Sequence, residues 1–288
     1  MATITTPPGA AAAAPKVART TKRPSGPFRW IREHIIAIIG SFVLFYMFLP
    51  IFVVVAFSFN KPLGRFNYQW VQFSTDAWTN LCAPGGMCDA LQLSLVIGLL
   101  ATLGSVILGT LVAFAIGRHR FRGRSATNLL IFMPMATPEV VMGSSLLTLF
   151  VAMNFARGLP TILIAHVMFC LSFVVVTVKA RIAGLDPRLE QAAMDLYADE
   201  RTTFWKITFP LVLPGIVGAS LLAFSLSFDD FIVTNFNSGS TVTFPMYVWG
   251  AAQRGTPPQI NVVGSLMFFV SLGIVLVAQV VQRRRAKA

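Results

Sequence analysis

The stretch Leu91–Gly117 reads LQLSLVIGLLATLGSVILGTLVAFAIG and holds no charged residue. A helix needs about 20 consecutive apolar residues to cross a bilayer, and this stretch is long enough. Its small residues recur every three or four positions and so share one helical face. They are Gly98, Ala101, Ser105, Gly109, Ala113 and Gly117. Because small side chains let helices approach closely in lipid, the stretch predicts a membrane-spanning helix with one packed face.

Apolar stretches of similar length recur along the chain, which predicts an all-α membrane protein with about six transmembrane helices. The hydrophobic fraction is 55 %, the charged fraction is 12 % and the mean hydropathy is +0.71. A soluble domain carries about twice that charged fraction. The other spans are predicted at about Ile35–Phe59, Asn128–Phe150, Pro160–Val178, Gly215–Phe236 and Asn261–Val281.

Lys and Arg residues gather on one side of these spans. All but four of the 23 lie before the first span, in Arg118–Arg124, in Lys179–Pro214 or at the C-terminus. Loops rich in Lys and Arg stay in the cytoplasm, so both termini are predicted to lie inside. The net charge of +12 therefore reflects orientation in the bilayer. No nucleic-acid partner is expected, since nucleic-acid binders gather such residues on one folded face.

The ends and the loops add further expectations. Residues 1–29 are rich in Ala, Pro, Thr, Lys and Arg and are predicted to form a disordered basic cytoplasmic tail, followed by a transmembrane domain over 30–288. Cys82 and Cys88 lie in a loop predicted to be extracytoplasmic, where they could form a disulfide or stay as two thiols. No zinc or haem spacing occurs in the sequence, and neither a metal nor another cofactor is expected.

Three carboxylates fall within the predicted spans: Glu139, Asp229 and Asp230. A charge at bilayer depth costs roughly 3 kcal/mol on insertion scales, so such residues usually face a cavity or pair with another group. At about 1.5 Å per helical residue, Glu139 and Asp229 would lie at similar heights near or above the midplane.

These acids could hold a cationic substrate, with aromatic neighbours available for cation–π contact: Phe228, Phe231 and Phe236. Other roles stay open. One of the two adjacent aspartates could cap a helix or pair locally, and Glu139 could satisfy backbone groups freed by a kink at Pro138.

The segment between the fourth and fifth spans, Leu185–Ile216, reads LDPRLEQAAMDLYADERTTFWKITFPLVLPGI. It predicts two short amphipathic helices, one after Asp186-Pro187 and one from the N-cap residue Asp199. The segment resembles the EAA loop of ABC importer permeases, in which Glu is followed by Ala-Ala, by Asp-Leu-Gly-Ala and by a hydrophobic run with two prolines. The matching residues are Glu190, Ala192, Ala193, Asp195, Leu196, Ala198, Phe204, Pro210 and Pro214.

This resemblance implies the type I ABC importer permease fold, with the EAA-like loop at 179–214 docking on a separate ATPase. Tyr197 stands where that family has Gly, and Tyr resists the positive φ that Gly would supply. Either the turn takes another conformation or the docking geometry is altered. The sequence holds no G-x-x-x-x-G-K-[ST] phosphate loop, so ATP hydrolysis is expected on another chain, and this chain is not expected to be an enzyme.

Four more segments extend the resemblance: Thr137–Met142 (TPEVVM), His166–Val178 (HVMFCLSFVVVTV), Ser225–Phe231 (SLSFDDF) and Pro257–Asn261 (PPQIN). Together they resemble the PotC-type permeases of spermidine/putrescine importers, from about Leu91 to the C-terminus. The resemblance implies a bacterial inner-membrane permease in which Glu139, Asp229 and Asp230 line a polyamine path. It also implies a second permease, two copies of an ATPase and an extracytoplasmic substrate-binding protein as partners.

Three alternatives stay open from the residues. The same machinery could carry another solute, although an anion permease should show basic residues within the spans and a sugar site needs no buried acids. An ion-coupled secondary transporter would use the acids as proton carriers but leaves the EAA-like loop unexplained, and co-purification of an ATPase separates the two. A scaffold without transport gives the intramembrane carboxylates no purpose.

Overall fold

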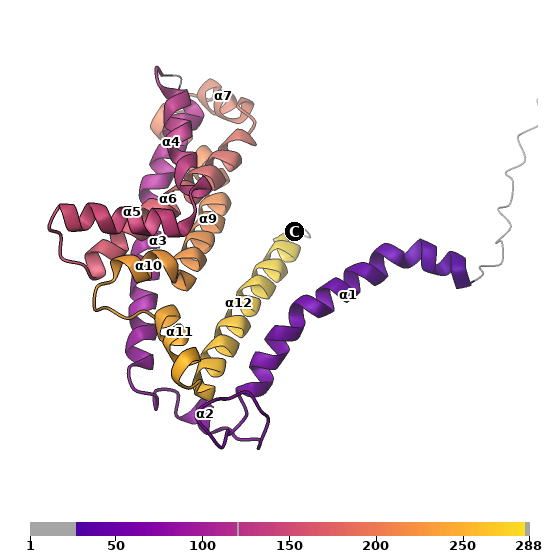
Figure 1. Ribbon diagram of the computed structural model, residues 1–288. Helices are drawn as coiled ribbons and strands as arrows, with labels where there is room; N and C mark the ends of the chain where they lie inside the picture. The colour runs from indigo at the N-terminus through magenta and orange to yellow at the C-terminus, as the bar shows by residue number, and fades with distance from the viewer. Residues whose placement is uncertain (1–26, 120, 286–288) are drawn as a thin grey trace, which may run out of the picture. The chain divides into compact units, whose positions relative to one another are not determined.

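The computed structural model describes residues 27–119 and 121–285 (Figure 1). Apart from an isolated bridge between Asn60 and Phe73, these residues form helices and loops, which confirms the all-α class. The elements are α1 (Pro27–Phe57), α2 (Asp76–Thr79), α3 (Met87–Arg118), α4 (Arg124–Ala136), α5 (Glu139–Ala152), α6 (Leu159–Ala183), α7 (Arg188–Asp195), α8 (Glu200–Thr203), the π-helical turn η1 (Phe204–Thr208), α9 (Phe209–Asp229), α10 (Ile232–Asn237), α11 (Phe244–Arg254) and α12 (Pro258–Arg285).

Residues up to Phe52 and residues from Val53 onward form two separate units. The first unit contains most of α1, whose apolar part is His34–Phe57. Most of the tail predicted at 1–29 lies outside the described residues, and its last three residues belong to α1.

Five helices in the described part of the chain are long and apolar enough to cross a membrane, and there are up to six spans if α4 and α5 make one broken span. The five agree with predicted spans one, two, four, five and six. No charged side chain interrupts the middle of α3 or α6, and both are continuous helices.

The third predicted span, Asn128–Phe150, is not one straight helix, which corrects the sequence-based expectation. Its two halves, α4 and α5, meet at an angle of 106°. The break lies at Thr137-Pro138, where Thr137 takes an extended conformation. The ring of a proline clashes with a helical conformation of the residue before it, so the chain leaves the helix here. Counting helical rise along a single axis therefore does not give the depth of Glu139.

The fifth span also differs from its prediction at the C-terminal end. Helix α9 ends at Asp229, Asp230 is extended, and the short helix α10 follows. The next segment, 237–260, lies between the fifth and sixth predicted spans and contains α11. Thr243 precedes the first turn of α11 and Pro245 lies within that turn, a position that proline tolerates because the first amides have no intrahelical partner.

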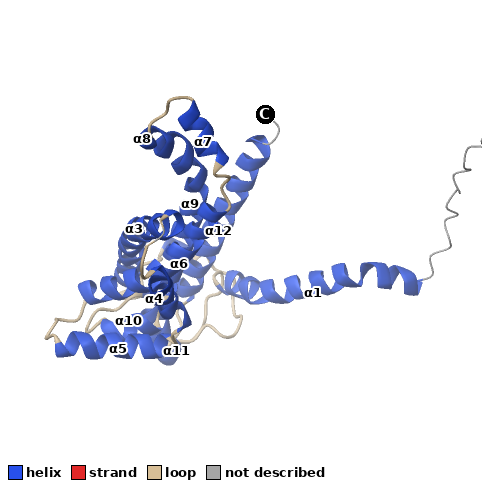
Figure 2. Ribbon diagram, turned by 90° about the horizontal axis from the view of Figure 1, so that it is seen from above, coloured by secondary structure: helices blue, strands red, loops and turns tan. Residues whose placement is uncertain are grey.

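The centre of the second unit is formed by α3, α6 and α9, which pack against one another (Figures 1 and 2). The predicted stripe of small residues on α3 lies in this contact, and Ala101, Ser105 and Ala113 are fully buried. The contact is closest at Gly109, where an added Cβ would lie 2.7 Å from Val174 Cγ1 on α6. Since lipid supplies no hydrophobic force between helices, this close backbone approach is what holds α3 against α6.

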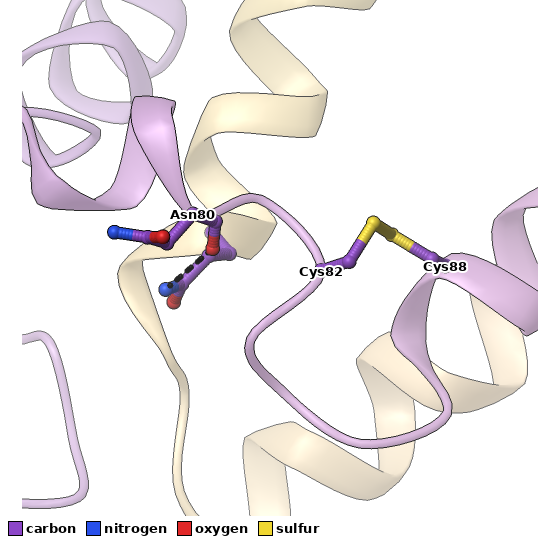
Figure 3. Close-up of a disulfide and its surroundings, with 4 residues drawn as sticks. Asn80, Cys82 and Cys88 are labelled. Atoms are coloured by element: carbon purple, nitrogen blue, oxygen red, sulfur yellow. Dashed lines mark hydrogen bonds between the residues drawn. A yellow bond between two sulfur atoms is a disulfide. The ribbon is translucent and has the colours of Figure 1, made fainter.

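The loop between α2 and α3 is closed by a disulfide. Cys82 and Cys88 are bonded, with their Cα atoms 5.4 Å apart (Figure 3). In the same loop, the carbonyl of Asn80 accepts a hydrogen bond of 3.4 Å from the side-chain amide of Gln259 on α12. The loop thus joins the start of α3 to the start of α12.

Gly109 provides a direct test of this packing. We expect Gly109→Ala to destabilise the protein by about 1–3 kcal/mol, because the added methyl overfills the α3–α6 contact. The control is Gly218→Ala on α9, where an added Cβ meets nothing within 4 Å. That change should be neutral or stabilising by about 0.5–1 kcal/mol, since Ala favours a helix over Gly. Thermal unfolding of both variants in detergent measures the difference, and equal shifts would contradict the packing argument.

Candidate functional site

Asp229 is the last residue of α9 and lies in the wall of a cavity of ≈ 390 Å³. The remaining lining residues are apolar, and most come from α11: Phe228, Phe231, Phe244, Pro245, Val248, Trp249 and Ala252. The carboxylate of Asp229 is thus the one charged group in this wall. A single negative charge among aromatic rings suits a cation, which can pair with the carboxylate and lie on a ring face.

The rings in the cavity are ordered by contacts with each other. The centroids of Phe231 and Trp249 are 5.4 Å apart, and those of Phe228 and Phe244 are 6.3 Å apart. Phe228 lies at the end of α9 and Phe231 lies in the break after it, and both have their partner ring on α11. The break after Asp229 and the position of α11 together shape the wall. The side chain of Trp249 is 57 % exposed, which leaves its indole available to a ligand or to another subunit.

Asp230 has a different environment from its neighbour. Its side chain accepts hydrogen bonds from the backbone N–H of Thr234 at 2.8 Å and from the Thr234 hydroxyl at 2.7 Å. These bonds satisfy donors at the start of α10, as a capping side chain does. Asp230 is 9 % exposed and does not line the cavity. The local capping role considered from the sequence therefore matches its contacts.

His166 connects this cap to α6. The imidazole is 1 % exposed. Its Nδ1 lies 2.7 Å from the Ser227 hydroxyl and its Nε2 lies 2.9 Å from the Thr234 hydroxyl, with Asp230 Oδ2 at 3.4 Å. Both ring nitrogens thus have partners on the neighbouring elements α9 and α10. The network fixes the geometry of the break that places Asp229 in the cavity.

Glu139 is the first residue of α5 and is exposed. It is not among the residues that line the Asp229 cavity. One turn later, Gly143 packs on α10, where an added Cβ would lie 2.9 Å from the Phe236 ring and 3.3 Å from Val233 Cα. Phe236 therefore packs between α10 and α5. It does not line the cavity, although the sequence suggested it as a neighbour of a bound cation.

Sequence reasoning missed the contribution of α11 and of His166. The signal for α11 was the short run FPMYVWGAA from Phe244, with Thr243 before it and Pro245 near its start. His166 offered no signal, because its two hydroxyl partners are about 60 and 70 residues away and only the fold brings them together.

The EAA-like loop folds as two helices followed by η1. Glu190 on α7 pairs with the guanidinium of Arg118 at the end of α3, and it accepts a hydrogen bond from the Thr208 hydroxyl on η1. Hydrogen bonding from Arg118 lowers the pKa of Glu190 below its usual value. The pair therefore contributes stability above the ordinary pKa of a glutamate and loses it as pH falls through the lowered value.

The second helix begins as predicted. Asp199 accepts a hydrogen bond from the backbone N–H of Thr202 at 3.1 Å, which confirms it as the N-cap of α8. The turn before it contains Tyr197 with φ +63°, so the turn keeps the left-handed conformation that a Gly would supply. Five other residues matched to the EAA pattern lie on α7 or in this turn: Ala192, Ala193, Asp195, Leu196 and Ala198. The remaining three lie further on, Phe204 in η1 and Pro210 and Pro214 in α9.

Comparisons with known proteins decide between the alternatives that the residues left open. Residues 105–287 match the family described as the inner membrane component of binding-protein-dependent transport systems. The chain belongs to this family. It is accordingly a permease subunit of an ABC importer, a multi-pass protein of the bacterial inner membrane whose family transports solutes, and the reading as a lone secondary transporter is set aside.

Individual relatives cover most of the permease. It is 37 % identical over 240 residues to the spermidine/putrescine transport system permease protein PotC of Haemophilus influenzae, covering 83 % of this chain and 93 % of the relative. The chain is also 37 % identical over 230 residues to the putrescine transport system permease protein PotI of Escherichia coli. This match covers 77 % of this chain and 81 % of that relative. A solved structure of a bacterial ABC transporter involved in alginate import has the same fold, with a TM-score of 0.63 and 16 % sequence identity. The match covers 91 % of this chain and 99 % of the chain in that structure.

The pair between Glu190 and Arg118 should hold α7 to the end of α3. We expect Glu190→Gln to speed amide hydrogen exchange in α7 about two- to fivefold, because a partly exposed ion pair is worth about 0.5–1 kcal/mol. Glu200→Gln in the same loop is the control and should leave exchange in α7 unchanged. An equal effect of both changes would mean that the pair does not restrain α7.

The network around Asp230 makes a different prediction. Asp230→Ala leaves the amides that begin α10 without their acceptor and removes the carboxylate beside His166, and we expect a loss of about 2–4 kcal/mol in stability. Asp229→Asn should leave the thermal unfolding midpoint nearly unchanged, since its carboxylate faces the cavity. Similar midpoints for the two variants would contradict the division of roles between the two aspartates.

Proposed function

We propose that this permease carries polyamines such as spermidine or putrescine into the cell, and that the cavity at Asp229 is a contact point on their path. The observation that carries the proposal is one carboxylate surrounded by aromatic rings, with no basic residue among the lining side chains. The names of the relatives, a spermidine/putrescine permease and a putrescine permease, point to the same class of cargo.

The chemistry of the cavity fits an alkylammonium group better than other cargo. An ammonium pairs with the carboxylate of Asp229, and the indole of Trp249 or the ring of Phe231 offers a face for cation–π contact. The methylene chain between two amines can lie along the apolar wall formed from α11. An anion would be repelled by Asp229, and a sugar would find few hydrogen-bonding groups in a wall that is mostly aromatic.

Glu139 is proposed as a second contact on the same path. It is exposed at the start of α5, and α5 packs against α10, the helix that follows Asp229-Asp230. A polyamine carries several separated charges, so two carboxylates on neighbouring elements could hold two of its amines. Asp230 is proposed as a positioning residue on this path, because its contacts fix the break after Asp229.

Transport would require partners that close the cavity and supply energy. Asp229 and Trp249 are exposed in the single chain, and a second permease subunit would cover them and complete the path. Two copies of an ATPase would dock on the loop at 179–214, and an extracytoplasmic substrate-binding protein would deliver the polyamine. Residues 30–288 would then form the permease domain, with residues 1–29 as a cytoplasmic tail.

The contacts of Glu190 suggest how the loop could act on the bundle. Glu190 connects α7 to the end of α3 through Arg118 and to η1 through Thr208. Helix α9 continues directly from η1 and ends at Asp229. Movement of α7 by the ATPases would thus reach both α3 and the helix that carries the substrate contact, which is the linkage that alternating access requires.

The transport role of Asp229 can be tested by uptake of labelled spermidine and putrescine into proteoliposomes that contain the complete importer. We expect Asp229→Asn to lower uptake about tenfold to a hundredfold, since loss of a charged partner costs about 1.5–3 kcal/mol. Asp89→Asn, an exposed acid in the first turn of α3, is the control and should retain uptake. Full uptake by Asp229→Asn would remove the cavity from the path, and absence of any polyamine uptake by the unaltered importer would overturn the proposed cargo.

A further inference from the structure

Three basic side chains from three different helices surround a cavity of ≈ 270 Å³ in the second unit. They are Arg118 at the end of α3, Arg124 at the start of α4 and Lys179 near the end of α6. Among the described residues that line the cavity, none is acidic. Like charges that converge on one cavity repel each other, so this arrangement favours an anion between them.

Two of these three charges have no acidic partner. Arg118 is paired with Glu190. Neither Arg124 nor Lys179 forms an ion pair with a residue that the structure describes, and both are half-buried. The ammonium of Lys179 donates one hydrogen bond, of 2.7 Å, to Asn128 Oδ1 on α4. An ammonium has three donors, so two remain for the oxygen atoms of a ligand.

The cavity lies at the depth of the lipid headgroups on the cytoplasmic side. Arg118 directly follows the predicted span of α3, and Lys179 directly follows that of α6. These two span ends face the cytoplasm by the distribution of Lys and Arg. The phosphate groups of the inner leaflet lie just outside the hydrocarbon region, and basic pockets between helix ends on this side suit anionic headgroups.

The apolar surface in and near the cavity favours a lipid over a free phosphate ion. Ile182 and Leu185 contribute apolar side chains to the wall. Helix α4 has no buried residue, and within two turns of Arg124 it exposes two leucines, Leu129 and Leu130. The acyl chains of a phospholipid remove such surface from water, whereas a free phosphate ion gains nothing from it.

We propose that this cavity binds the phosphate group of an anionic phospholipid of the inner leaflet. The guanidinium of Arg124 and the ammonium of Lys179 hold the phosphate oxygens, and an acyl chain lies along α4. The bound lipid joins the start of α4 to the end of α6, beside the pair of Arg118 and Glu190 that holds α7. The inference concerns the membrane and is independent of the cargo proposed above.

The test measures the affinity of the full-length permease for phosphatidylglycerol, with the permease purified together with the subunits that accompany it. Native mass spectrometry of the delipidated protein counts bound lipid during a titration. Phosphatidylcholine and inorganic phosphate are the two comparison ligands. The substitutions are Arg124→Gln, Lys179→Gln and both together. Arg122→Gln is the matched control, because Arg122 is exposed in the same turn and does not line the cavity.

Phosphatidylglycerol should bind about tenfold or more tightly than phosphatidylcholine, and inorganic phosphate at millimolar concentration should not displace it. Each single substitution should weaken binding of phosphatidylglycerol about fivefold, and the double substitution about twentyfold, because each removes one basic group. Arg122→Gln and the charge-keeping Lys179→Arg should stay within about twofold of the unaltered protein. Thermal unfolding midpoints of the variants without lipid should match, which separates loss of the ligand from loss of the fold.

Four results would overturn the inference. Equal binding of the two lipids would mean that the cavity does not select an anionic headgroup. Displacement of the lipid by inorganic phosphate would make a free ion the ligand. An effect of Arg122→Gln as large as that of Arg124→Gln would assign the attraction to general surface charge. Unchanged binding by the double variant would place the lipid elsewhere on the protein.

Discussion

Both nitrogens of the His166 ring lie within hydrogen-bond distance of hydroxyl groups in the interior of the bundle, on Ser227 and Thr234. In lipid a polar group cannot be satisfied by solvent, so every donor and acceptor at this depth needs a partner inside the protein. A helix that breaks at bilayer depth must meet this requirement for its freed backbone groups. Asp230 meets it for the start of α10, and His166 anchors the cap to α6. The aromatic wall around Asp229 depends on this break, which Asp230 and His166 hold in place.

The sequence was informative wherever a local pattern decides the structure. Uninterrupted apolar runs located five helices, and the stripe through Gly109 identified the packed face of α3. The N-cap at Asp199 was also readable, since capping depends on a residue and its nearest neighbours. The EAA-like pattern identified the segment that folds into α7 and α8, because that pattern spans many consecutive positions.

Features that depend on distant partners were not readable in the same way. The proline at position 138 signalled a kink, but the 106° turn of α5 also reflects its packing on α10, nearly 100 residues later. The two adjacent aspartates look alike in sequence, and only the position of His166 and Thr234 separates a capping role for one from an exposed position in the cavity for the other. Trp249 became a cavity residue because α11 returns to the end of α9, a placement that no local pattern encodes.

The π-helical turn η1 has a geometric consequence for the rest of α9. In this turn the N–H of Phe209 reaches back five residues to the carbonyl of Phe204, one residue further than in an α-helix. It therefore stores one extra residue between the coupling loop and the helix. Rewinding that turn into ordinary α-helix would rotate the rest of α9 by about 100° about the helix axis. A small change in backbone hydrogen bonding next to the loop would thus rotate α9 about its own axis. This rotation would turn Asp229 toward or away from the rings of α11 without bending the helix.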